Sequence, residues 1–233
     1  MKLAILFLLA TLFSPFLLAD ERDQYQFGLR FNPHLAWLAT DTDDDLELDN
    51  DGVNAGFSFG VQGDIRFAEN YFFATELRIT RGFTGTMEVV DVDEDRKFDA
   101  EYDFNSVEIP LGLKMRTPQF GYFDFFGRFS LIPGVYTERS ETLTSATGSA
   151  EELGSEDLRI MRAAFEITLG TNYQIAESLY LKGGLAYNHS MFNLVRNSLE
   201  EDDHDLPQNY HWRMDEEMSL QNHYMALNLG VLF

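Results

Sequence analysis

The sequence predicts an all-β fold, an eight-stranded antiparallel transmembrane β-barrel with long extracellular loops and short periplasmic turns. Three observations predict it. Eight segments alternate between apolar and polar residues, the linkers between them alternate between short and long, and the chain ends in an alternating run closed by Phe. The 233 residues include 21 Phe, 10 Tyr and 17 Gly, a composition that favours strands over helices.

Composition also excludes several classes of function. The chain has no Cys, which rules out disulfides, thiolate metal sites and cysteine nucleophiles. With 17 basic against 39 acidic residues the net charge is −22. No nucleic acid partner is therefore expected, because phosphate binding requires clustered Lys and Arg. No cofactor is expected either.

Residues 1–19 predict a cleaved signal peptide. A charged start at Lys2 is followed by an apolar run over 3–18, which ends at Ala19 before an acidic segment. A retained membrane anchor is the alternative, but the run is shorter than the ~20 residues that a helix needs to span a bilayer. No later segment is as long and apolar, which excludes a helical membrane protein and leaves 20–233 as one barrel domain.

The eight predicted strands are, in chain order, 24–38, 53–67, 71–83, 104–116, 121–137, 158–174, 178–192 and 218–233. Their apolar faces run, in the same order, from Tyr25 to Trp37, Val53 to Phe67, Phe73 to Phe83, Val107 to Met115, Phe123 to Val135, Ala163 to Tyr173, Leu179 to Met191 and Met225 to Phe233. Each face covers about ten residues, the length that a tilted membrane strand needs. A soluble β-sandwich or lipocalin-like barrel would also alternate, but with the apolar face inside.

The polar faces carry glycines and mid-strand charges of both signs, which is typical of an interior where charges pair. This lumen charge network consists of Arg30, Asp64, Arg66, Glu76, Arg78, Glu108, Lys114, Arg116, Asp124, Arg128, Arg162, Glu166 and Lys182. Eight strands enclose a space just wide enough for side chains. We therefore expect a plugged polar lumen, filled by these groups and Phe126, and no diffusion channel.

The linkers predict which end faces outward. Those at 68–70, 117–120 and 175–178 are short, whereas those at 39–52, 87–103, 138–157 and 193–217 are long and hold 29 of the 39 acidic residues. An even number of strands places both termini at the short-turn, periplasmic end. The four acidic loops would then project outside the cell.

The C-terminal segment 224–233 resembles the terminal strand of bacterial outer-membrane barrels. The barrel-assembly machinery recognises that strand. The assembly signal would consist of Met225, Leu227, Leu229, Val231 and Phe233. Segments 73–79, 107–114 and 184–194 further resemble the PorT-like outer-membrane β-barrel family of Gram-negative bacteria. That resemblance implies an integral protein surrounded by outer-membrane lipid. It also implies an accessory role in type IX protein secretion, with secretion-machinery subunits as partners, but it brings no catalytic motif.

Two segments suggest sites, each with a structural alternative. Glu108 and Pro110 face inward, and Pro removes a donor from the strand ladder. This marks either a gate or docking notch, or a bend with Glu108 paired to a lumen Arg, and the bend is the simpler interpretation.

Residues 47–52 resemble the start of a Ca²⁺ loop, but Ser58 occupies the position of the closing Glu. Diffuse attraction of divalent cations, or a hydrated repulsive loop, would explain the same acids.

Two histidines could also meet on the outer face. If Leu179 pairs with Phe233, residues whose numbers sum to 412 lie opposite each other, which places His189 beside His223. They could contact lipopolysaccharide phosphate or a metal, although two His alone form an incomplete metal site. Ser190 adjoins His189, but neighbours in a strand point to opposite faces, so they do not form a nucleophile–base pair.

The sequence leaves three classes of function open, and we expect a protein that is not an enzyme. One is an accessory of protein secretion or envelope assembly, which the family resemblance suggests. Another is a structural or adhesive surface barrel whose acidic loops bind cations or an external partner. The least supported is a lipid-modifying outer-membrane enzyme.

Overall fold

The computed structural model describes residues 24–41, 46–50, 52–91, 96–145, 150–153, 158–194 and 219–233. The predicted signal peptide at 1–19 and the centres of the four predicted loops lie outside these residues. Within the described part of the chain, no helix is long and apolar enough to cross a membrane.

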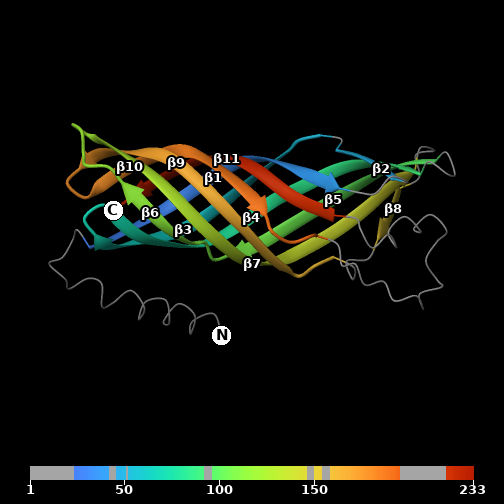
Figure 1. Ribbon diagram of the computed structural model, residues 1–233, viewed down its shortest axis with the longest axis horizontal. Helices are drawn as coiled ribbons and strands as arrows, with labels where there is room; N and C mark the ends of the chain where they lie inside the picture. Colours follow the sequence, from blue (N-terminus) through green and yellow to red (C-terminus); the bar gives the residue numbers. More distant parts are fainter. Residues whose placement is uncertain are drawn as a thin grey trace.

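The described residues form one antiparallel sheet of eleven strands (Figure 1). They are β1 (Tyr25–Asp41), β2 (Leu46–Asn50), β3 (Asn54–Ala68), β4 (Tyr71–Asp91), β5 (Arg96–Glu108), β6 (Leu111–Arg116), β7 (Phe123–Ser145), β8 (Ala150–Leu153), β9 (Met161–Ala176), β10 (Leu179–Ser190) and β11 (Ser219–Leu232). The order β4-β3-β1-β11-β10-β9-β7-β5 closes on itself, because β4 also pairs with β5. With β6 continuing β5 after residues 109–110, this ring confirms the predicted eight-stranded antiparallel barrel.

The two ends of the barrel differ as the linkers predict. One end is here called the short-turn end. There, residues 69–70 join β3 to β4, and residues 177–178 join β9 to β10. Phe233 lies at the same end, where its backbone exchanges hydrogen bonds of 2.8 and 3.0 Å with Phe27 of β1. The opposite end is here called the long-loop end. β2 pairs with β4 and β8 pairs with β7 outside the ring.

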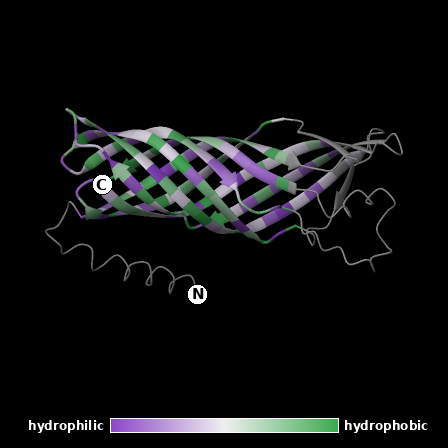
Figure 2. Cartoon of the chain, viewed as in Figure 1, coloured by the Kyte–Doolittle hydropathy of each residue, from purple (hydrophilic) through white to green (hydrophobic). Residues whose placement is uncertain are grey.

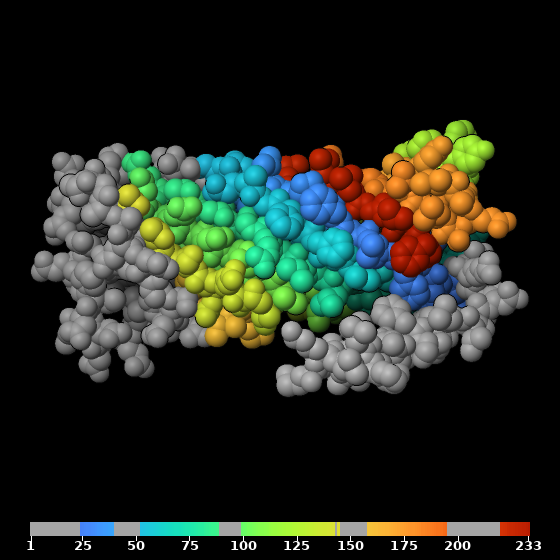
Figure 3. Space-filling view, turned by 180° about the vertical axis from the view of Figure 1, so that it is seen from behind, coloured from blue at the N-terminus to red at the C-terminus, as the bar shows by residue number. Residues whose placement is uncertain are grey.

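The outer wall of the barrel carries a belt of exposed apolar side chains. Phe59 is 48% exposed, Leu113 60% and Leu169 64%, although each belongs to a regular strand. Hydrophobic and hydrophilic residues alternate along the strands (Figure 2). In the space-filling view the blue side chains of β1 lie between the red of β11 and the cyan of β3, in the order of the ring (Figure 3). A wall this apolar is typical of a barrel surrounded by lipid.

Three strands extend well beyond their predicted ends, and one side-chain prediction is wrong. β4 continues to Asp91 and β5 begins at Arg96, so most of the predicted loop 87–103 is a β-hairpin. β7 continues to Ser145, into the predicted loop 138–157. Phe83, predicted on the outer face, is 1% exposed inside the barrel. The cause is a bulge between Thr80 and Phe83, where Gly82 adopts a φ of +74° and shifts the alternation by one residue.

A second bulge lies beside the first. The register of β7 against β5 shifts next to Asn105, which pairs with Glu138 while Ser106 pairs with Tyr136. Asn105 contacts both bulges, because its Oδ1 accepts from Gly82 N at 3.3 Å and its Nδ2 donates to Glu138. From the bulges toward the long-loop end, the outer faces of β4, β5 and β7 are polar.

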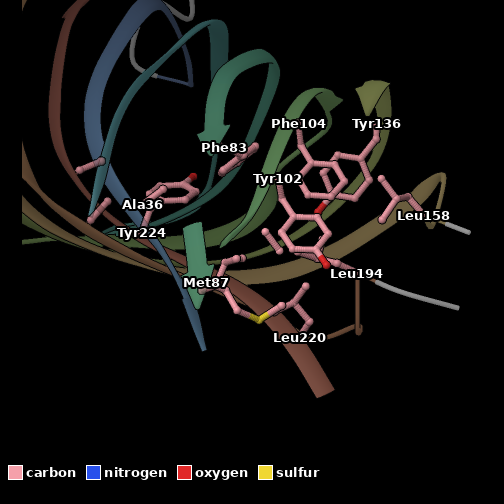
Figure 4. Packing of buried hydrophobic residues seen from close by; sticks show 14 residues of the cluster. Ala36, Phe83, Met87, Tyr102, Phe104, Tyr136, Leu158, Leu194, Leu220 and Tyr224 are labelled. Carbon is pink, nitrogen blue, oxygen red and sulfur yellow. The ribbon is translucent and has the colours of Figure 1, made fainter. Parts of the chain in front are cut away.

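The interior changes character at the same level. Toward the long-loop end it is filled by an apolar cluster that includes Phe83, Met87, Tyr102, Phe104 and Tyr136 (Figure 4). The predicted polar lumen therefore occupies only the part nearer the short-turn end. Above the bulges β4 and β5 have their apolar side inside and their polar side outside, as in a soluble barrel.

Candidate functional site

Most of the lumen charge network is buried inside the ring. The buried members are Arg30, Asp64, Glu76, Arg78, Glu108, Lys114, Asp124, Arg128, Arg162, Glu166 and Lys182. The alternation of each strand positions these side chains, because residues two apart share a face.

Glu166 of β9 and Arg78 of β4 form the centre of this network. Arg78 Nη1 and Nη2 donate to Glu166 Oε2 and Oε1 at 2.7 and 3.2 Å, a two-pronged contact across the lumen. Arg128 Nη2 donates to Glu166 Oε1 at 2.9 Å. Tyr224 Oη donates to Glu166 Oε2 at 3.1 Å, so the phenol separates the charged layer from the apolar cluster above it.

Glu76 of β4 is the second carboxylate of this layer. It pairs with Arg30 of β1 and accepts from Arg78 Nε at 3.1 Å, while Arg128 Nη2 lies 3.5 Å away. The charges of the layer therefore come from β1, β4, β7 and β9, around much of the ring. Such a set locks facing strands together and leaves few free charges in the lumen.

Glu108 and Pro110 occupy a bend in the strand ladder. Glu108 accepts from Arg162 Nη1 and from Ser106 Oγ, both at 2.8 Å. The backbone remains hydrogen-bonded across the break, with Glu76 N donating to Pro110 O at 3.1 Å. These contacts favour the bend, with Glu108 paired to a lumen Arg, over a gate or docking notch.

Two lysines lie around Phe126 nearer the short-turn end. Lys114 Nζ donates to Asp64 Oδ2 at 2.7 Å and lies 5.1 Å from the Phe126 ring centre. Lys182 Nζ donates to Gln62 Oε1 at 3.0 Å and lies 4.7 Å from the same ring. Among the described residues, no carboxylate lies within salt-bridge distance of Lys182. Its charge is held by an amide and a ring face.

Three members lie toward the short-turn mouth. Asp124 accepts from Asn172 Nδ2 at 2.6 Å and lies 3.9 Å from Arg116 Nε. Arg116 is only half-buried, and Arg66 is also half-buried and donates to the backbone carbonyl of Glu69 at 2.9 Å. Arg66 therefore does not join the ion pairs inside, because it lies where the strand ends.

The predicted assembly signal forms the outer face of β11. Met225, Leu227, Leu229 and Phe233 are exposed on the barrel wall, and Val231 is half-buried. These five side chains continue the belt of exposed apolar side chains that the neighbouring strands carry.

The predicted register brings the two histidines together. His189 pairs with His223 across β10 and β11, and their Nδ1 atoms are 2.9 Å apart. The sequence reasoning missed Tyr187, whose Oη lies 3.1 Å from His223 Nδ1, and Trp37, whose ring stacks on His223. Tyr187 could have been found, because it lies two residues before His189 on the same face.

Ser190 and His189 point to opposite faces of β10, as expected of neighbours in a strand. Ser190 is 1% exposed on the inner face, where its Oγ donates to Phe192 O at 3.2 Å, while His189 faces outward. No group of three or more His, Asp or Glu side chains that could hold a metal is found in this part of the chain. The side chains of 47–51, at the predicted Ca²⁺ loop, lie outside the described ones.

Beyond the bulges, the outer side of β4, β5 and β7 forms a polar surface, here called the acidic face. Asp99, Glu101 and Asp103 are exposed on β5. The acidic face consists of these residues with Thr84, Thr86 and Glu88 of β4 and Ser140, Thr142 and Thr144 of β7. Thr84 Oγ1 donates to Asp103 Oδ1 at 3.2 Å. At its lower edge a hollow of about 410 Å³ is lined by Asp103, Thr137, Glu138, Arg139 and Ser140.

The sequence matches the family described as outer membrane protein beta-barrel domain over residues 19–196. A search of curated proteins finds no match.

Several solved structures are similar in fold. Neisserial surface protein A is 11% identical, over 89% of this chain and 95% of that one, with a TM-score of 0.48. The outer membrane protein OprG from Pseudomonas aeruginosa is 12% identical, over 90% and 96%, with a TM-score of 0.49. The outer membrane protease OmpT from Escherichia coli is 8% identical, over 93% and 98%, with a TM-score of 0.46. At these identities the likeness concerns the fold alone.

Proposed function

The chain belongs to the outer membrane protein beta-barrel domain family, and from this premise we propose that it is a non-enzymatic surface barrel whose acidic face binds a cationic partner outside the cell. Membership makes it an integral outer-membrane protein. In this proposal, outer-membrane lipid surrounds the apolar belt, the short-turn end and both termini lie in the periplasm, and the long-loop end faces outward. The observation that carries the proposal is the acidic face, which lies beyond the belt on strands that continue past the bulges.

The spacing of the carboxylates favours an extended basic chain as the partner. Asp99, Glu101 and Asp103 occupy alternate positions of one strand, about 7 Å apart at a rise of about 3.3 Å per residue. Basic residues at alternate positions of an extended peptide repeat at the same distance. Threonine or serine lies opposite Glu101 and Asp103 on both neighbouring strands and can hydrogen-bond such a peptide.

The same spacing disfavours a chelated divalent cation over most of the face. Ca²⁺ collects six to eight oxygens at about 2.3–2.6 Å, and carboxylates about 7 Å apart do not close around one ion. Glu88 and Asp99, which lie opposite each other on β4 and β5, are the exception. Divalent cations are therefore a secondary ligand in this proposal.

The experiment compares two variants with the same change in charge. Glu101→Gln with Asp103→Asn removes two acids from the acidic face. Purified protein in neutral phosphatidylcholine nanodiscs is titrated with fluorescent polylysine and followed by anisotropy. Affinity should fall roughly fivefold, since two exposed charges contribute about 1 kcal/mol together.

The matched control is Glu69→Gln with Glu177→Gln, which removes two exposed acids at the short-turn end. The control should bind polylysine as the unchanged protein does. An equal loss in both variants would show that binding follows net charge alone and would contradict the proposal.

The PorT-like resemblance supports a second function, an accessory of protein secretion, for which the partners are secretion-machinery subunits. A native-detergent pull-down from the outer membrane, followed by mass spectrometry, separates the two functions. Recovery of secretion subunits in a fixed ratio favours the accessory, whereas a lone barrel favours the surface function. The barrel-assembly machinery is expected as a transient partner in either case.

A further inference from the structure

A group of imidazole and aromatic side chains lies on the outer wall, where the apolar belt meets the long-loop end. His223 is the next outward residue after Met225 on β11, and Tyr187 and His189 occupy the same level on the neighbouring β10. Trp37 of β1 pairs with His223 from the other side. Tyr187 is 37% exposed and His189 is half-buried, so an ion can approach the group from the surface of the wall.

Three electron-pair donors converge in this group. The Nδ1 atoms of His189 and His223 are 2.9 Å apart, and Tyr187 Oη lies 3.1 Å from His223 Nδ1. Two facing imidazole nitrogens at that distance share one proton, which a metal ion can replace. His223 Nε2 is buried without a hydrogen-bond partner, so no acceptor in the described residues fixes the tautomer of this ring.

Neighbouring rings hold the donors in place. Trp37 stacks on His223 with 6.0 Å between ring centres and 13° between planes. Phe165 of β9 packs on His189 with ring centres 4.8 Å apart. Both imidazoles are therefore positioned by packing as well as by their mutual contact, which lowers the cost of ordering them around an ion.

We propose that His189, His223 and Tyr187 form a binding site for a divalent transition-metal ion, and that Cu²⁺ fits it best. Two nitrogens bound at right angles at about 2.0 Å from an ion lie about 2.8 Å apart, close to the observed separation, whereas a tetrahedral ion needs about 3.3 Å. The right-angled arrangement is the one that Cu²⁺ prefers. The Tyr187 phenol supplies the third ligand and water from the interface completes the coordination. This site is independent of the acidic face.

Trp37 serves as the reporter, because a paramagnetic ion at the site quenches the fluorescence of the stacked indole. The protein has two Trp, so the Trp212→Phe variant leaves Trp37 as the only source of signal. This variant, purified without a polyhistidine tag into nanodiscs, is titrated with CuSO₄ and, in parallel, with ZnCl₂. Saturable quenching by Cu²⁺ is expected, with Zn²⁺ as a weaker competitor. The electron paramagnetic resonance spectrum of bound Cu²⁺ should show two nitrogen ligands.

The variants assign the signal to residues. In the same background, His189→Asn with His223→Asn should abolish saturable quenching, and Tyr187→Phe should weaken it roughly tenfold, on the scale measured for supporting groups of metal sites. His204→Asn with His211→Asn, which removes two histidines of the linker 193–217, is the matched control and should leave quenching unchanged.

Folding of each variant is checked by its mobility on an unboiled gel, and Tyr187→Phe provides a test if the double variant does not assemble. Quenching that survives the loss of His189 and His223, or disappears with His204 and His211, would overturn the proposal. So would a copper spectrum with oxygen ligands alone.

Discussion

Among single residues, Glu166 is the carboxylate at the centre of the lumen charge network, where three arginines and the Tyr224 phenol surround it. Arg78 and Arg128 bond to it at 2.7 and 2.9 Å, and Arg30 Nη2 lies 3.6 Å away. A buried carboxylate with such partners balances positive charges that have no access to water. Removing its charge leaves those cations uncompensated in an interior of low dielectric.

We expect Glu166→Gln to destabilise the barrel by about 3–5 kcal/mol, the usual cost of breaking a buried ion pair from one side. Lys182→Met should cost only about 1 kcal/mol, because Lys182 is held by Gln62 and Phe126 and its removal leaves one amide oxygen unpaired. The temperature at which the folded band disappears from an unboiled gel compares the two. A larger effect from Lys182→Met would contradict this account of the charges.

The sequence predicted which of these residues face inward but not their partners. Alternation alone placed Arg78 and Glu166 in the interior. Their contact joins strands 88 residues apart and depends on the tilt and offset of strands around the ring. No local pattern encodes that offset, whereas the register of the adjacent strands that carry His189 and His223 followed from one hairpin.

Among the elements, β5 lies between the two bulged strands, β4 and β7, and has no bulge itself. Its buried residues keep a single alternation from Ala100 to Glu108, while β4 and β7 each gain a residue beside it. Asn105 joins the three strands at this level. Asn105 therefore adds a side-chain connection between the barrel and the polar extension, which consists of the parts of β4, β5 and β7 beyond the bulges, in addition to the backbone pairing that runs through both.

Asn105→Ala should loosen the extension and lower its local stability by about 1–2 kcal/mol, since it removes a hydrogen bond to Gly82 N and another to Glu138. Limited trypsin digestion in nanodiscs should then cut faster after Arg96 or Lys97. Thr84→Ala, which removes one exposed hydrogen bond to Asp103 from the same sheet, is the control. Equal cleavage rates in the two variants would count against the role of Asn105.

The bulges also explain where sequence reasoning failed for the strands. Below them, outward apolar residues made each strand easy to recognise. Above them the alternation continues in inverted phase, so the pattern wrongly predicts Phe83 on the outer face and loops over 87–103 and 138–157. A φ of +74° at Gly82 leaves no trace in the pattern except the glycine itself, which is common in this chain.

For the molecule as a whole, closure of the ring depends on the pairing of its first and last strands. Leu29 pairs with Val231, and the backbones of Phe27 and Phe233 exchange two hydrogen bonds at the short-turn end. The terminal residue therefore takes part in closing the barrel in addition to any role as an assembly signal.

Deleting Phe233 should lower the yield of folded protein in the outer membrane, because it removes both backbone bonds and an aromatic side chain that is 59% exposed on the wall. The amount of the faster-migrating band on an unboiled gel of membrane fractions measures this yield. Phe233→Tyr, which keeps the backbone and the ring, should assemble normally. Normal assembly of the deletion would contradict the predicted terminal signal.

The unbroken course of β5 has a mechanical consequence. Its hydrogen bonds to β4 and β7 lie across the strand direction along nearly its full length. A pull on the hairpin in the direction of the strands moves β4 and β5 together, so the bonds between β5 and β7 are loaded in shear instead of being peeled apart one after another. At the other end of β5, Glu108 forms an ion pair of 2.8 Å with Arg162 of β9, which connects the strand to the ring a second time. A partner held at the tip would thus pull on the barrel as a whole.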